Sequence, residues 1–324
     1  MVEFEKLTDF DREIWAEELE NFVPRKIFDF HAHLWDNRFL PDGGKPLLDT
    51  DFAALDRWSK TVFPRRDVEY LLLGFPYVGM KLEKFHQFMA DEIEKSPNKL
   101  GSTVISPQMS AEELEYLVKK YRFCGIKPYF TFAADPGHCR ITDYFPEKLI
   151  ETADAEKLCV TLHMAGVDSI ADPENLADLR YLTAKYPNVR WILAHCCRSF
   201  NAYILERAVF PLRDLPNICY DLSAVCDIRS IWLLFKYENI SRIMFGTDNI
   251  IAGGMRGTYI TWGRGWQYFS GADLAHCHSA STLVCYENLR AVRRAAEMAE
   301  LSQTDIENIF YNNAKQFFGK SVNK

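Results

Sequence analysis

Short apolar runs of strand length recur along the chain, and segments with a helical pattern separate them. The apolar runs are 26–31, 69–75, 100–106, 124–130, 159–164, 189–195, 217–223 and 242–247. Amphipathic helical patterns are clearest at 110–121, 146–157, 172–186 and 227–237. Strands that alternate with helices form parallel sheets, and eight parallel strands close into a barrel. The sequence therefore predicts an α/β fold, a (β/α)8 barrel of the TIM type, with a doubly wound open sheet as the alternative.

Side chains that can bind a metal stand at or just beyond the ends of four of these runs. His31 and His33 belong to the first run, His163 to the fifth, His195 to the sixth and Asp248 to the eighth. Residues two apart in a strand point to one face. A closed barrel gathers its strand ends above one mouth, whereas an open sheet scatters them. Neutral imidazole suits zinc, manganese or iron, and a carboxylate completes a mixed site. The pattern favours the barrel and predicts a metal centre at its mouth.

Strict alternation along the strands also predicts which side chains face outward. If the strand-end histidines and Asp248 point into the barrel, residues at odd spacing from them point toward the surrounding helices. The expected outward-facing residues are Phe28, Phe30, Ala32, Ile192, Ala194, Ile243, Phe245 and Thr247. Most of them are apolar, as the layer between sheet and helices must be.

Two cationic side chains lie near the same strand ends. Lys127 falls inside the fourth run, where alternation points its ammonium group into the barrel. Burial of that charge without a partner would be costly. Three interpretations stay open for Lys127: an ion pair with Asp221 or another inward acid, a contact to a substrate carboxylate, or carbamylation to bridge two metal ions. Arg198 either clamps a substrate carboxylate or braces its own loop, and His195 is either a metal ligand or a group that polarises the substrate.

Three segments exceed what a minimal barrel requires. Residues 1–24 are expected to form a helix that closes the barrel bottom or packs on its side, and 36–65 form a long connection after the first strand. The segment 249–280 is rich in glycine and aromatic residues, and long loops at the catalytic face of a barrel usually shape the substrate pocket. Trp266 beside Arg264 would offer a wall for a ring-bearing carboxylate. The alternative is an aromatic cluster that packs this loop onto the barrel or onto a neighbouring subunit.

Composition narrows the partners and the compartment. The net charge of -7 disfavours nucleic acid and anionic membrane surfaces as partners. No run approaches the roughly 18 apolar residues that a membrane span requires. Nine cysteines, an odd number without zinc-ribbon or secreted-scaffold spacing, predict a reducing compartment and hence a cytoplasmic protein. We expect one domain over residues 1–324, with the barrel core at about 26–318, and a small-molecule substrate; the sequence leaves a homo-oligomer open.

With these residues in view, the chain resembles the amidohydrolase superfamily. It is most similar to the branch of metal-dependent barrel hydrolases related to aminocarboxymuconate-semialdehyde decarboxylase. The motifs that carry the resemblance are Phe28-Asp29-Phe30-His31-Ala32-His33, Leu162-His163, Leu193-Ala194-His195-Cys196, Phe245-Gly246-Thr247-Asp248 and Phe310-Tyr311-Asn312-Asn313-Ala314. The resemblance implies one divalent metal ion, usually zinc, held by His31, His33, His163 and Asp248. A second ion is implied only if Lys127 is carbamylated.

The resemblance also implies separate catalytic roles for Asp248 and His195. Asp248 would be the base that takes the proton of a catalytic water, and His195 would polarise the substrate or steady an oxyanion. The sequence departs from the family pattern at Asn249, where an aromatic residue or a proline is frequent, so we expect an altered pocket floor. Pro128 directly after Lys127 is also an unusual context for a carbamylated lysine.

The sequence thus predicts a metal-dependent hydrolase that uses activated water on a small polar or carboxylate-bearing carbonyl substrate, such as an ester, lactone or amide. The residues assigned to catalysis are Asp248 and His195, and those assigned to substrate binding are Lys127, Arg198, Arg264 and Trp266. The alternative is a non-oxidative decarboxylase of a small aromatic or unsaturated acid with the same metal site. A barrel that binds a ligand without catalysis is the third possibility.

Overall fold

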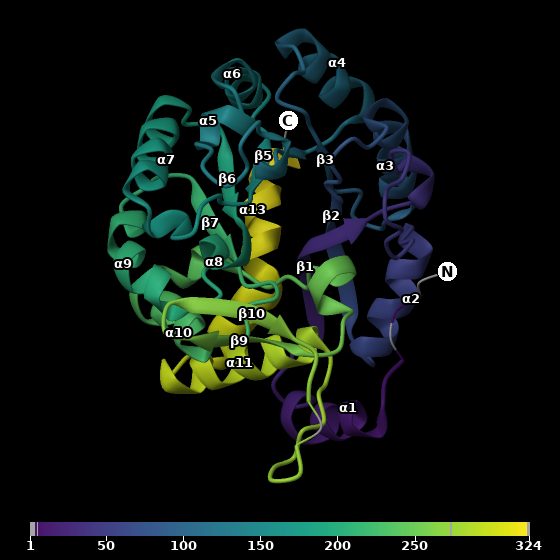
Figure 1. The fold of residues 1–324 in the computed structure, drawn as a ribbon, viewed down its shortest axis with the longest axis vertical. Helices are drawn as coiled ribbons and strands as arrows, with labels where there is room; N and C mark the ends of the chain where they lie inside the picture. The colour runs from purple at the N-terminus through teal and green to yellow at the C-terminus, as the bar shows by residue number, and fades with distance from the viewer. Residues whose placement is uncertain (1–3, 5, 273, 323–324) are drawn as a thin grey trace.

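Eight parallel strands form the centre of the molecule, hydrogen-bonded in chain order from the first to the eighth (Figure 1). The structure is a computed structural model that describes residues 4, 6–272 and 274–322. The strands are β1 (Lys26–Leu34), β2 (Asp67–Gly74), β3 (Gly101–Val104), β4 (Gly125–Lys127), β5 (Cys159–Leu162), β6 (Arg190–Leu193), β7 (Ile218–Asp221) and β8 (Ile243–Met244). All eight predicted strands are present. The predicted fourth strand, 124–130, ends early at Lys127, because Pro128 has no N–H to continue a ladder.

The ring closes between β1 and the end of β8. The backbone N–H of Phe30 donates to the carbonyl of Phe245 at 2.9 Å, and the N–H of Asp248 donates to the carbonyl of His31 at 2.8 Å. These bonds join the first strand to the last, which an open doubly wound sheet cannot do. The predicted (β/α)8 barrel is confirmed and the open sheet is wrong.

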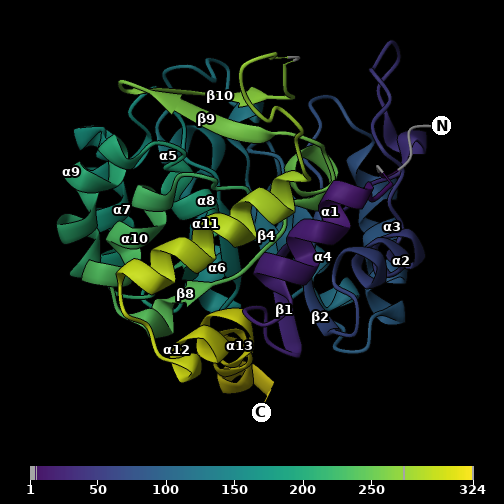
Figure 2. The same cartoon turned by 90° about the horizontal axis from the view of Figure 1, so that it is seen from below.

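Helices alternate with the strands and surround the barrel (Figures 1 and 2). Ser110 opens α4 with a capping box to Glu113, as its sequence predicts, and Asp172 caps α7 ahead of Pro173 at the first helical position. The helices are α1 (Asp9–Ile14), α2 (Phe52–Val62), α3 (Leu82–Lys95), α4 (Ala111–Tyr121), α5 (Ile141–Tyr144), α6 (Glu147–Ala155), α7 (Pro173–Lys185), α8 (Ala194–Arg198), α9 (Ala202–Arg213), α10 (Ile228–Tyr237), α11 (Val284–Met298), α12 (Gln303–Glu307) and α13 (Asn313–Val322). In the described part of the chain, no helix is both long and apolar enough to cross a bilayer.

The N-terminal extension packs on the side of the barrel, beside α11 (Figure 2). The ring of Trp15, just after α1, lies 5.7 Å from the ring of Tyr286 on α11. The buried carboxylate of Asp11 accepts hydrogen bonds from Arg256 and Thr282. Burial opposes ionisation of Asp11, but these donors outweigh it and lower its pKa to about 2. Of the two placements expected for residues 1–24, the described part of this segment takes the one at the side of the barrel.

The C-terminal helix α13 closes the bottom of the barrel, where the strands begin. The ring of Phe318 stacks on Phe28 at 5.8 Å and lies 5.7 Å from Phe30. These residues belong to one apolar cluster inside the barrel, comprising Phe28, Phe30, Leu71, Leu73, Cys159, Ile192, Cys219, Met244, Ala314 and Phe318. The cluster is interior because Cys219 shares a face of β7 with Asp221, and Asp221 contacts His31.

This interior cluster corrects part of the predicted strand orientation. Phe28, Phe30 and Ile192 point into the barrel, not toward the helices. In β1 the register against β2 shifts between Asp29 and Ala32, where β1 contains one extra residue. Such a bulge restarts the alternation, so that Phe30 and the following histidine both face inward. Ala32, Ile243 and Phe245 pack in the larger outer core, as predicted.

The long segment after β8 is not an open loop. It contains an antiparallel hairpin, β9 (Thr258–Trp262) and β10 (Gly265–Phe269), in which Gly265 pairs with Trp262. Figure 2 shows the hairpin at the end of the barrel opposite α13. The hairpin therefore lies at the mouth, where the strands end.

Candidate metal centre

Three side chains from the β1 and β8 strand ends meet at the mouth. His31 Nε2 lies 3.2 Å from His33 Nε2. The Oδ1 atom of Asp248 lies 3.3 Å from His33 Nε2 and 3.8 Å from His31 Nε2. All three residues are buried. Two imidazole nitrogens and a carboxylate oxygen thus converge on one point, the arrangement that a divalent cation requires.

Two more histidines surround this group. The Nε2 atom of His195 lies 3.9 Å from Asp248 Oδ2, and its ring lies 4.9 Å from the ring of His31. The ring of His163 lies 5.3 Å from that of His195. One ligand atom from each of His31, His195 and Asp248 lies within 4.8 Å of the other two. The structure therefore brings together all five strand-end residues singled out in the sequence, and His195 lies as close to the centre as the predicted ligands.

The electrostatics of the group suit a bound cation. Burial, followed by the charge of Lys127, lowers the pKa of both His31 and His33, and burial lowers that of His163. These rings are therefore neutral, which is the form that binds metal. Burial opposes ionisation of Asp248, but the hydrogen bond from His33 and the neighbouring histidines hold its pKa well below its usual value.

The donor set provides the fit test for a metal. The Nε2 atoms of His31 and His33 lie 3.2 Å apart and both face Oδ1 of Asp248. The buried Nδ1 atom of His163 has no hydrogen-bond partner among the described residues, although buried polar atoms are normally paired. Neutral imidazole nitrogens set around an ionised carboxylate fit a divalent cation.

The side chains of Asp29 and Asn249 join β1 to the segment after β8, and these two segments carry His31, His33 and Asp248. The carboxylate of Asp29 accepts the N–H of His31 at 3.1 Å and both the N–H and the hydroxyl of Thr247, at 2.9 and 2.5 Å. The side chain of Asn249 accepts the N–H of His33 at 2.6 Å and donates to its carbonyl at 3.1 Å. Asn249 therefore clamps the backbone of β1. It is fully buried and does not line the cavity, so the expected change of the pocket floor is not seen.

The segment that carries His195 is the one labelled α8, and its backbone forms a left-handed turn, not a right-handed α-helix. The four residues from His195 to Arg198 have φ between 53° and 62°. Residues other than glycine adopt this conformation at a cost of roughly 1–2 kcal/mol each. The N–H of His195 donates to Asp221 at 3.2 Å, and Ser169 donates to the carbonyl of Cys197 at 2.6 Å. The turn ends β6 at Leu193, two residues before the predicted end, and these bonds hold His195 over the mouth.

The metal-site residues form the floor of a cavity of about 310 Å³. Three of the four side chains predicted to bind substrate, Lys127, Arg198 and Trp266, line this cavity, and the fourth, Arg264, does not. Its guanidinium instead stacks on Tyr203, 4.3 Å from the ring centre. The full lining consists of His31, His33, Phe75, Pro76, Lys127, Tyr129, Phe130, His163, His195, Arg198, Phe200, Asp248, Ile251, Tyr259 and Trp266. The cavity thus combines two cationic side chains with aromatic walls.

The two cations of the cavity are held differently. Lys127 Nζ lies 3.0 Å from His31 Nε2, and burial lowers its pKa to about 8. Among the described residues, neither Asp221 nor another acid lies within ion-pair distance of Lys127 Nζ, although the charges of Asp248 and Asp221 partly oppose the effect of burial on its pKa. The ion-pair interpretation of Lys127 therefore has no direct contact behind it, and the contact to a substrate carboxylate and the carbamylation stay open. Arg198 donates one bond to the carbonyl of Gly166 at 2.6 Å, and its guanidinium lies 5.8 Å from the Trp266 ring.

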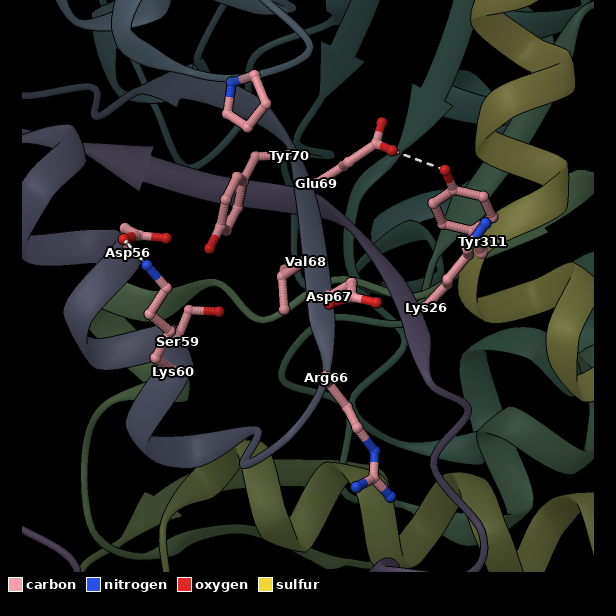
Figure 3. Close-up of a pocket in the computed structure, with 11 residues that line it drawn as sticks. Lys26, Asp56, Ser59, Lys60, Arg66, Asp67, Val68, Glu69, Tyr70 and Tyr311 are labelled. Atoms are coloured by element: carbon pink, nitrogen blue, oxygen red, sulfur yellow. Dashed lines mark hydrogen bonds and ion pairs between the residues drawn. The ribbon is translucent and has the colours of Figure 1, made fainter.

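A second hollow, of about 380 Å³, lies at the other end of β1 and β2 (Figure 3). Several of its charged groups have partners: Lys60 contacts Asp56 at 2.6 Å, and Glu69 accepts a bond from the hydroxyl of Tyr311 at 2.6 Å. It contains none of the strand-end ligands. The mouth is therefore the candidate active site.

Sequence reasoning missed two residues that contact the histidines. Asp221 was considered only as an ion-pair partner, and Ser223 not at all. The signal available was that Asp221 ends the seventh strand on the inward face, where a carboxylate needs a partner. The aromatic lining from Phe75, Phe200 and Tyr259 carried no sequence signal, because aromatic residues in such positions are more often core.

Replacing Trp266 by alanine tests whether the hairpin selects substrate. Trp266 is half-buried and its ring lies 4.5 Å from Phe200 in the cavity wall. We expect Trp266→Ala to lower kcat/KM about 2–10-fold, with an altered substrate preference, because one aromatic contact is worth about 0.5–1.5 kcal/mol. Arg264→Ala, from the same hairpin but outside the cavity, is the matched control and should leave kcat/KM unchanged. If Trp266→Ala instead lowers the free energy of unfolding by about 3–5 kcal/mol and leaves substrate preference unchanged, the aromatic residues of the hairpin serve to pack it onto the barrel.

Comparison with known proteins agrees with this site. The family model described as amidohydrolase matches residues 28–320. A search of curated proteins finds no match. A solved structure of a probable 2-pyrone-4,6-dicarboxylic acid hydrolase from Acinetobacter baumannii, with citric acid bound, is similar at a TM-score of 0.59 and 14% identity, covering 90% of this chain and 99% of that one.

Two further structures share the fold at equally low identity. A dihydroxybenzoic acid decarboxylase from a Polaromonas species, with bound manganese and the inhibitor 2-nitroresorcinol, has a TM-score of 0.55 and 16% identity over 91% of this chain and 97% of that one. A 4-oxalomesaconate hydratase from Rhodopseudomonas palustris has a TM-score of 0.54 and 16% identity over 91% and 96%. At such low identity, these structures support the barrel fold alone. The family model covers most of the sequence, and the barrel mouth carries a group of histidine and aspartate side chains that could hold a metal ion. The chain therefore belongs to the amidohydrolase family, whose members are metal-dependent.

Proposed function

We propose that the protein is a metal-dependent hydrolase of a small polar or carboxylate-bearing carbonyl compound, an ester, lactone or amide. The observation that carries the proposal is the position of Asp248. Its carboxylate lies on the cavity floor, 3.3 Å from His33 and 3.9 Å from His195. An ionised carboxylate beside a metal site and open to a cavity can accept the proton of an attacking water.

We propose one divalent ion, zinc in the first place, with manganese or iron as alternatives. Its ligands would be His31, His33, His163 and Asp248. When bound, such an ion lowers the pKa of water and polarises a carbonyl oxygen. A second ion would require carbamylated Lys127. This lysine lies against His31, so the same position also suits a contact to a substrate carboxylate.

Asp248, His195 and Arg198 each have a separate role in the proposed reaction. Asp248 takes the proton of the water and later passes it to the leaving group. In its doubly protonated form, which adds a hydrogen at Nε2, His195 donates to the oxygen on which negative charge develops. Removal of one such donor typically lowers the rate about 10²–10³-fold. Arg198, between Phe130 and Trp266, binds the substrate carboxylate, because a guanidinium pairs with carboxylates through two parallel bonds.

A non-oxidative decarboxylase is the second candidate. The observation that favours it is the combination of Arg198 with the aromatic walls of Phe130, Phe200 and Trp266, which suits a planar ring acid. One of the similar structures is a dihydroxybenzoic acid decarboxylase with manganese. In this reaction the cavity would hold the carboxylate that leaves as carbon dioxide, and a proton would be delivered to carbon.

A parallel assay separates the two reactions. Protein purified with zinc or manganese supplied should contain about one ion per chain by elemental analysis. It should then be tested for cleavage of small carboxylate-bearing esters, lactones and amides and for carbon dioxide release from hydroxybenzoate-type acids. Cleavage that a chelator abolishes and metal restores supports the hydrolase, whereas metal-dependent carbon dioxide release alone supports the decarboxylase. Absence of metal from the purified protein would overturn both.

We also propose that the substrate is a small molecule, that nucleic acid and membranes are not partners, and that the compartment is the cytoplasm. The acidic net charge and the odd number of cysteines support this. A homo-oligomer is compatible with these properties.

A further inference from the structure

Asp221, at the end of β7, is the fully buried acceptor of a convergent set of donors. Its Oδ2 atom lies 3.0 Å from Nδ1 of His31. Its Oδ1 atom accepts the backbone N–H of His195 at 3.2 Å and that of Ser223 at 3.0 Å. The hydroxyl of Ser223 also donates to Oδ1. One carboxylate thus contacts both a proposed ligand and the residue proposed to polarise the substrate.

Ser223 extends this contact to the ring of His195. Its Oγ atom lies 2.9 Å from Nδ1 of His195 and 3.3 Å from Nδ1 of His31, and its carbonyl lies 3.0 Å from Nδ1 of His195. Because the hydroxyl hydrogen is used by Asp221, Oγ can only accept at the two rings. The carbonyl also can only accept. Both Nδ1 atoms must therefore carry hydrogen.

We propose that Asp221, together with Ser223, is a positioning pair that fixes the tautomers of His31 and His195. Each ring holds its hydrogen on Nδ1 and presents the lone pair of Nε2 to the centre, where Asp248 lies 3.8 and 3.9 Å away. Partners behind a metal-binding imidazole orient the ring and raise its basicity. Asp221 also accepts the first N–H of the left-handed turn and so holds His195 in place. This inference rests on the proposed function for its consequence in catalysis, but the tautomers exist without metal.

A second buried acid, Glu238, follows α10 and contacts the other face of β7. Tyr220, next to Asp221 in β7, donates to Glu238 at 3.0 Å, and Glu238 also contacts Arg242 at 3.2 Å. Glu238 is thus a buried acid of the same strand region with no contact to the histidines. It provides a matched control for the removal of a buried negative charge.

The test compares Asp221→Asn, Ser223→Ala and Glu238→Gln. In the metal-free protein, nitrogen-15 NMR of the imidazoles should show Nδ1–H for His31 and His195, and Asp221→Asn should shift or remove those resonances. In titrations with Zn²⁺ against a chelator, Asp221→Asn should bind about 10–100-fold more weakly. Ser223→Ala should shift the two Nδ1–H resonances with a smaller loss of affinity. Glu238→Gln should change only the thermal stability.

Three results would overturn the proposal that Asp221 and Ser223 fix the two tautomers. Wild-type resonances and Zn²⁺ affinity in Asp221→Asn would overturn the proposal, and if that variant does not fold, wild-type resonances in Ser223→Ala would overturn it. An equal loss in Glu238→Gln would also overturn it, since the effect would then be general destabilisation. If wild-type protein shows the Nδ1–H resonances but binds no Zn²⁺, the proposed function fails while the positioning pair stands.

Discussion

Asp248→Asn is expected to lower kcat by about 10²–10⁴-fold, the range for loss of a general base. Asparagine has nearly the same shape, but it cannot accept the water proton and is a weaker metal ligand. The bound metal should therefore also fall below that of the wild type. Elemental analysis and kinetic assays of the same preparation measure both effects.

Asp56→Asn is the control for this substitution. Asp56 lies in the second hollow and pairs with Lys60 at the opposite end of the barrel (Figure 3). It should leave kcat and metal content unchanged. Asp248→Asn protein with full turnover would exclude Asp248 as the base, whatever its metal content.

His195→Asn is expected to keep the metal but lose about 10²–10³-fold in kcat, whereas His163→Ala is expected to lose metal. The first magnitude is that of one lost oxyanion donor. The test is needed because His195 lies within 4.8 Å of His31 and Asp248 in the group that could hold an ion. Metal content of both variants at the same Zn²⁺ concentration decides the assignment. Equal loss of metal in the two variants would make His195 a metal ligand and show that the roles assigned to the two histidines are wrong.

Much of the site could be predicted because its signals are local. The strand-end positions of His31, His163 and Asp248 follow from short apolar runs, and parallel strands end together. The N-cap of α4 at Ser110 depends on a hydrogen bond from the backbone N–H of Glu113, only three residues further along the chain. Such features need no knowledge of the rest of the chain.

The substrate wall could be predicted only in part. Trp266 reaches the cavity while Arg264, two residues away, stacks on Tyr203 outside it. The two differ because Trp266 lies in β10, whereas Arg264 lies in the turn that joins β9 to β10, and both positions depend on the pairing of these two strands. A segment interpreted as a loop gives no orientation for its side chains.

The eight strands, the barrel, the helices between the strands and the residue types at the mouth follow from spacings of two to four residues, so they can be predicted from the chain alone. The inward direction of Phe28 and Phe30 depends on contacts between strands, since a bulge relative to β2 interrupts the alternation. Packing of distant segments also places α13 at the bottom of the barrel and holds the left-handed turn that presents His195. The contact between His31 and Asp221 joins residues 190 positions apart. Such contacts arise when the ring of strands closes, and no local pattern encodes them.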